Sequence, residues 1–149
     1  MTCFIKANYP VKLEFINSYA TEPQKNNFIY WNDYAVSLAK LGKINQAKTT
    51  LNHPGFENLT IGEKSVKNAT LDLIEFRAGN AVEGRKLYNI AINEFENRGE
   101  LISTAIATYY LAFEEKHINS EEADKRIKQA KERLGKFNYP VYKYLAKML

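Results

Sequence analysis

Hydrophobic residues recur along most of this chain at intervals of three and four, the spacing that places side chains on one face of an α-helix. In the clearest stretch the apolar positions are Trp31, Tyr34, Ala35 and Leu38, followed by Ile44, Ala47 and Leu51. Gly42 separates the two runs, and glycine readily takes the left-handed conformation that ends many helices. The pattern predicts helices at 28–41 and 44–51 that pack antiparallel, with Ala35 and Ala47 where their backbones approach closely.

The same spacing predicts two further helical pairs and a helix near either end of the chain. The second pair covers 62–78 and 81–97, the third covers 100–116 and 120–134, and the flanking helices cover 10–21 and 140–149. Pro54-Gly55 predicts a loop at 52–61. The third pair has no glycine at its turn, and Asn119 or Ser120 is expected to cap its second helix, with Glu122 completing a capping box. The sequence therefore predicts eight helices.

The first two pairs repeat one another. The turn residue Gly42 and the small residue Ala47 recur 37 positions later as Gly79 and Gly84. That period is close to the roughly 34 residues of a tetratricopeptide repeat. In the first unit Trp31 matches the consensus Trp, Leu38 the Tyr, and Tyr34-Ala35 the Leu-Gly.

The chain therefore resembles the tetratricopeptide repeat (TPR) family over roughly residues 10–135. Pro54 stands where the consensus has a second alanine, and it should shorten the second helix. Asp72 and Glu75 replace a small and an aromatic residue, so we expect them to find basic partners unless the helix is rotated. The resemblance implies an all-α protein, an α-α superhelix (TPR-like solenoid) of about three helical hairpins with capping helices, in one domain spanning 1–149.

Charge and composition narrow the class of protein. Residues 116–149 hold nine Lys/Arg against four Asp/Glu, so the net charge of +4 is carried by the C-terminal part. There is no apolar run long enough to cross a membrane, no signal-peptide pattern at the start, and a single cysteine, Cys3. We therefore expect a cytoplasmic protein that does not associate with membranes.

Residues suited to catalysis are few. His53 and His117 are the only histidines and have no Cys or carboxylate at metal-binding spacing. Gly62-Glu63-Lys64-Ser65 lacks the upstream glycine of a phosphate loop and is interpreted as a helix start. Asp72 and Glu75 lie one helical turn apart, but a surface or salt-bridged pair is favoured over a metal or acid–base pair. We expect no enzyme activity, catalytic residue, cofactor or metal site.

The resemblance implies instead a protein–protein interaction or scaffolding module. Its partner would be another protein or a further domain of the same polypeptide, and a homo-oligomer is left open. The residues expected on the concave partner-binding face are Asn32, Val36, Lys40, Lys43, Leu73, Phe76, Arg77, Thr108 and Glu115. For Leu73 and Phe76 the alternative is a place in the core between helices.

Binding of RNA or DNA is the alternative function. The basic residues that suggest it are Lys125, Lys128, Lys131 and Arg133, all on one predicted helix, with tyrosines following at 139, 142 and 144. Basic side chains neutralise phosphates and aromatic rings stack on unpaired bases. The alternative interpretation of this helix is a solvated surface, because charged runs are common on exposed helices.

Overall fold

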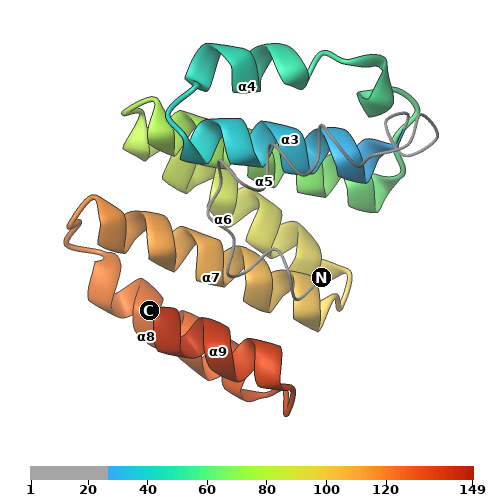
Figure 1. Cartoon of the computed structure of the whole chain (residues 1–149). Coiled ribbons are helices and arrows are strands. Elements are labelled where there is room, and N and C mark those ends of the chain that lie inside the picture. Colours follow the sequence, from blue (N-terminus) through green and yellow to red (C-terminus); the bar gives the residue numbers. More distant parts are fainter. Residues whose placement is uncertain (1–26) are drawn as a thin grey trace. The chain divides into compact units, whose positions relative to one another are not determined.

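A computed structural model describes residues 27–149, and this part of the chain is helical without strands (Figure 1). The elements are α3 (Phe28–Lys40), α4 (Ile44–Thr50), the 3₁₀ helix η2 (Pro54–Phe56), α5 (Ile61–Arg77), α6 (Ala81–Asn97), α7 (Leu101–His117), α8 (Ala123–Gly135) and α9 (Pro140–Met148). Seven predicted helices are thus confirmed, most to within a residue or two at each end. The predicted helix at 10–21 lies outside the described residues.

Four turns between these helices share one geometry. The second residue after each helix takes a left-handed conformation, with φ of 75° at Gly42, 89° at Gly79, 71° at Gly99 and 49° at Asn119. The next amide in each turn donates to the carbonyl five residues earlier, for example Lys43 N to Leu38 O at 2.9 Å and Ser120 N to Glu115 O at 3.1 Å. Asparagine is the residue other than glycine that most readily takes this conformation, so Asn119 replaces the missing turn glycine.

This turn corrects the predicted cap of α8. Asn119 belongs to the turn, and the Ser120 hydroxyl donates to the Glu115 carboxylate, so neither side chain caps the helix. The helix begins later than predicted, at Ala123, and the residue before it, Glu122, makes no capping hydrogen bond through its side chain. The competing hydrogen bond to Glu115 explains why the capping box does not form.

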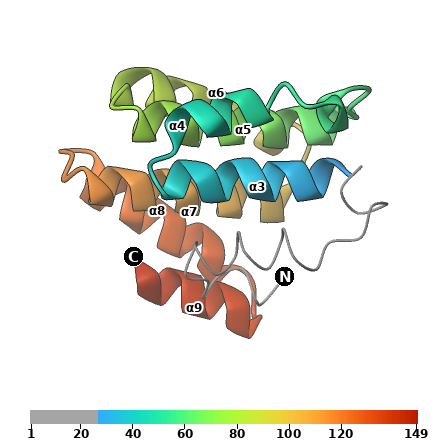
Figure 2. The ribbon, with the colours of Figure 1, turned by 45° about the horizontal axis from the view of Figure 1, so that its top comes forward.

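The chain divides into two compact units, Met1–Gly84 and Arg85–Leu149, with the division inside α6. In the described part of the first unit, α3 packs against α4, α5 and η2 (Figure 2). Ala35 and Ala47 are fully buried, which confirms the predicted close approach of α3 and α4. Lys48 of α4 forms an ion pair with Glu75 of α5 at 2.7 Å.

Pro54 ends α4 early, as predicted, and the following loop folds back onto α3. The His53 ring stacks on Trp31 with centroids 3.7 Å apart, and its Nδ1 accepts a hydrogen bond from the Gly55 amide at 3.0 Å. Phe56 meets Phe28 edge to face, with centroids 5.5 Å apart. The first half of α3 is therefore covered by the loop rather than by a longer α4.

In the second unit, α7 packs against α8 and α8 against α9. Small and branched apolar residues fill these contacts, and the buried ones on α7, α8 and α9 include Leu111, Ala112, Ala130, Leu134 and Leu145. Two polar contacts link α6 to the rest of the unit, Arg85 to Glu115 and Arg133 to Glu96.

Candidate functional site

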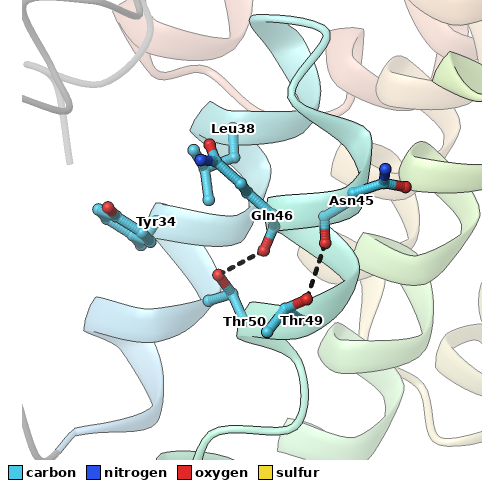
Figure 3. A pocket seen from close by; sticks show the side chains of 6 residues that line it. All are labelled: Tyr34, Leu38, Asn45, Gln46, Thr49 and Thr50. Atoms are coloured by element: carbon cyan, nitrogen blue, oxygen red, sulfur yellow. Dashed lines mark hydrogen bonds between the residues drawn. The ribbon is translucent and has the colours of Figure 1, made fainter.

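A hollow of about 370 Å³ lies between α3 and α4 in the first unit (Figure 3). Its lining residues are Tyr34, Leu38, Asn45, Gln46, Thr49 and Thr50. α4 is only seven residues long and joins α3 through the tight turn at Gly42. Its one charged residue, Lys48, does not line the hollow and forms an ion pair with Glu75 of α5.

The chemistry of this hollow is that of a neutral binding surface. Leu38 is buried and Tyr34 half-buried, while Asn45, Gln46 and Thr49 are exposed. The threonine hydroxyls donate within α4, from Thr49 to the Asn45 carbonyl at 3.0 Å and from Thr50 to the Gln46 carbonyl at 2.8 Å (Figure 3). The exposed carboxamides of Asn45 and Gln46 can both donate and accept hydrogen bonds.

None of the six lining residues is a histidine, cysteine, lysine or carboxylate. The hollow therefore offers apolar contact beside amide hydrogen bonds, and no side chain suited to proton transfer near neutral pH. In the described part of the chain, no group of three or more His, Cys, Asp or Glu side chains is arranged to hold a metal ion.

The nine residues predicted for the concave face divide into two groups. Leu73, Phe76, Thr108 and Glu115 are buried, each exposing at most 4% of its surface. Their side chains therefore lie in the interior. For Leu73 and Phe76 this agrees with the alternative left open by the sequence, a place in the core between helices. Lys43 is exposed, and Asn32, Val36, Lys40 and Arg77 are half-buried.

Asn32, one of the half-buried residues of the predicted face, forms a hydrogen bond between two helices. Its Oδ1 accepts a hydrogen bond from the Thr70 hydroxyl at 2.7 Å, which links α3 to α5. Asn32 is therefore already used for helix packing. The other four residues of the second group, Val36, Lys40, Lys43 and Arg77, also retain exposed surface.

Glu115 is the centre of a buried ion pair. Arg85 donates to both carboxylate oxygens, at 2.6 and 3.0 Å, and Ser120 donates to one of them at 2.5 Å. Burial by itself would raise the pKa of Glu115, but these hydrogen bonds and the nearby positive charges outweigh it, so the pKa lies below its ordinary value. Glu115 thus has a structural role between α6, α7 and the following turn.

Asp72 and Glu75, the other two acidic residues considered in the sequence, differ in their surroundings. Hydrogen bonds from Lys48 and Asn80 lower the pKa of Glu75, with Nζ of Lys48 at 2.7 Å and Nδ2 of Asn80 at 2.6 Å. The expectation of a basic partner is confirmed for Glu75. Asp72 is fully buried in α5.

The four basic residues proposed for nucleic acid differ in their surroundings. Arg133 lies between α6 and α7, where one guanidinium nitrogen contacts Glu96 at 2.5 Å and another donates to Thr108 at 2.7 Å. It is therefore engaged within the fold.

Lys125, Lys128 and Lys131 are exposed on α8. Acidic residues lie near two of them: Glu122 forms an ion pair with Lys125 at 3.7 Å, and the exposed Asp124 and Glu132 lie four residues before and after Lys128. Residues four apart are neighbours on a helix, so the positive charge of this face is largely offset.

The sequence pattern did not single out the hollow. It assigned Tyr34 and Leu38 to the core, and the four polar lining residues of α4 match no known motif. The sequence signal that could have indicated the hollow is that these four residues, Asn45, Gln46, Thr49 and Thr50, are all uncharged.

No described helix has both the length and the apolar character needed to cross a membrane. Comparisons with protein families, with curated proteins and with solved structures find no match to this chain.

Proposed function

We propose that the chain is a non-enzymatic protein-interaction module, a TPR-like array of helical hairpins that binds a segment of a partner protein. The observation that carries the proposal is the hollow between α3 and α4. An apolar wall beside uncharged amides suits a peptide, because the wall accepts an apolar side chain while the amides pair with peptide N–H and C=O groups.

The repeated turns support the same proposal. Helical hairpins closed by one turn geometry bury their apolar faces by stacking, and such arrays present extended surfaces for partners. The accessible residues of the predicted concave face, in particular Val36, Lys40, Lys43 and Arg77, would extend the contact beyond the hollow. The partner would be another protein or a further domain of the same polypeptide.

Capture from native lysate with paired variants tests the proposal. Asn45→Arg/Thr49→Arg places two charged side chains on the exposed side of α4, one helical turn apart. Asn93→Arg/Asn97→Arg is the matched control, since both asparagines are exposed on α6 and are also one turn apart. Both double variants add the same charge, so they differ only in where it is placed.

We expect the control to retain the proteins captured by the unaltered chain and the α4 variant to lose them by about tenfold or more, which is 1.4 kcal/mol of binding free energy. Circular dichroism establishes that both variants remain folded. Equal capture by the two variants would remove the hollow as the binding site, and capture of nothing above a tag-only control would remove the proposed function.

A further inference from the structure

The C-terminal part of the second unit carries positive charge without acidic residues. Glu132 is the last acid of the sequence, and the four basic residues that follow it are Arg133, Lys136, Lys143 and Lys147. Arg133 is engaged by Glu96 and Thr108. Lys136, Lys143 and Lys147 are exposed, so their charges are presented to solvent.

These lysines align with an exposed aromatic ring. Lys143 and Lys147 are four residues apart on one side of α9, about 6 Å from one another along the helix, and Tyr139 is the residue directly before the helix. Tyr139 precedes the helix and exposes 62% of its surface. It meets Tyr142 edge to face, with centroids 6.1 Å apart, and that contact leaves most of the Tyr139 ring in solvent.

The opposite side of α9 is used inside the protein. Leu145 and Leu149 are buried, and α9 packs against α8. A helix that lies in a membrane surface inserts its apolar side into the lipid. The apolar side of α9 is not available for that, whereas a polyanion in solution matches the exposed lysines in charge and needs no insertion.

We propose that Tyr139, Lys143 and Lys147, with Lys136 beside them, form a binding site for single-stranded nucleic acid, called here the α9 stripe. The lysines contact successive phosphates and a base stacks on the Tyr139 ring, the combination by which proteins bind single strands without reading sequence. This activity is additional to the proposed protein binding and uses a different unit of the chain. It also differs from α8, where acids lie near two of the lysines.

Fluorescence anisotropy with a labelled oligouridylate tests the α9 stripe in the full chain. Lys143→Glu/Lys147→Glu reverses it, and Lys125→Glu/Lys128→Glu on α8 is the matched control with the same change in net charge. Tyr139→Ala and Tyr139→Phe separate stacking from charge. The Tyr139 side chain makes no capping hydrogen bond to α9, so its removal takes no such bond from the helix.

We expect the α9 reversal to weaken binding at least tenfold and the α8 reversal less than about threefold at roughly 50 mM salt. In a plot of log binding constant against log salt concentration, the slope for the α9 variant should be smaller by about 0.7 for each phosphate contact removed. Tyr139→Ala should weaken binding about fivefold or more, while Tyr139→Phe retains it.

Four results would overturn the proposal: no binding by the unaltered chain at low salt, equal losses from the two reversals, no effect of Tyr139→Ala, or binding to phosphatidylserine vesicles in place of the oligonucleotide. Equal losses would show that net charge alone attracts the strand. Binding to vesicles would identify a lipid surface as the ligand. Circular dichroism of each variant keeps a loss of folding separate from a loss of binding.

Discussion

Gly84, the last residue of the first unit, packs closely against α5, and Gly84→Ala tests this contact. A β-carbon at Gly84 would lie 2.5 Å from Cδ2 of Phe76 and 3.0 Å from both the Asp72 carbonyl oxygen and the Phe76 amide nitrogen. Carbon atoms in ordinary contact are about 3.5 to 4.0 Å apart, so the overlap with Phe76 is about 1 Å. The Phe76 ring is buried, and the other two atoms belong to the backbone of α5. None of the three can move aside freely.

Two effects of opposite sign decide the outcome. Alanine is favoured over glycine within a helix by about 0.8 to 1.0 kcal/mol, which alone would stabilise the variant. An extra methyl group in a filled contact costs about 1 to 3 kcal/mol. Gly62→Ala isolates the first effect, because Gly62 lies in α5 with no atom within 4 Å of the added β-carbon. We expect Gly62→Ala to stabilise the protein and Gly84→Ala to be less stable than Gly62→Ala by about 1 to 3 kcal/mol.

Urea unfolding followed by tryptophan fluorescence measures this difference. Trp31 is the only tryptophan of the chain and lies in the same unit as both glycines, so its emission reports on that unit directly. Equal stabilisation by the two alanine substitutions would refute the reasoning, since it would mean that Gly84 does not approach Phe76 and Asp72 of α5 as closely as these distances indicate.

Three further predictions concern the loop, the ion pair and the turn. Gly55→Ala should destabilise the first unit by about 1 to 3 kcal/mol in the same assay, because the added carbon would lie 2.5 Å from the indole of Trp31; an unchanged midpoint would contradict the stacked loop. Glu115→Gln should lower the free energy of unfolding at neutral pH by about 2 to 3 kcal/mol. Because the folded pKa of Glu115 is lowered, its contribution is present above the unfolded value of about 4.3 and is lost as the pH falls through the folded pKa. The thermal midpoint measured by circular dichroism should therefore fall less steeply with decreasing pH in the variant than in the unaltered protein. Parallel dependence of the two midpoints on pH would argue against the ion pair. Asn119→Ala should cost about 1 kcal/mol because of the left-handed backbone, whereas Asn119→Gly should not destabilise; equal thermal midpoints for the two variants would count against this explanation.

The sequence was most informative about helix positions. Spacings of three and four around Trp31, Val66 and Leu101 predicted helices that the structure contains, because amphipathic periodicity follows directly from burial on one side. Pro54 predicted the shortening of α4 for an equally local reason, the backbone restriction of proline. The turn at Asn119 could also have been predicted, since asparagine is the usual alternative to glycine there.

Features that depend on packing between helices were not visible in the sequence. Periodicity cannot tell a residue that faces a neighbouring helix from one that faces a groove, so Thr108 and Glu115 were assigned to the concave face although they are buried, and Leu73 was left between that face and the core. Arg133 resembled its lysine neighbours on α8 until Glu96 and Thr108 were seen to contact it. The hollow is formed by residues of both α3 and α4, so no single residue of the sequence predicts it.

Site-specific photo-crosslinking tests the central proposal, protein binding at the hollow, most directly. A benzophenone side chain in place of Gln46 faces the hollow, and the same side chain in place of the exposed Asn93 on α6 is the control. On irradiation in native lysate, we expect a discrete crosslinked protein from position 46 that is absent from position 93 and is lost in the Asn45→Arg/Thr49→Arg variant. Identical crosslinks from both positions, or none from position 46, would contradict the proposal.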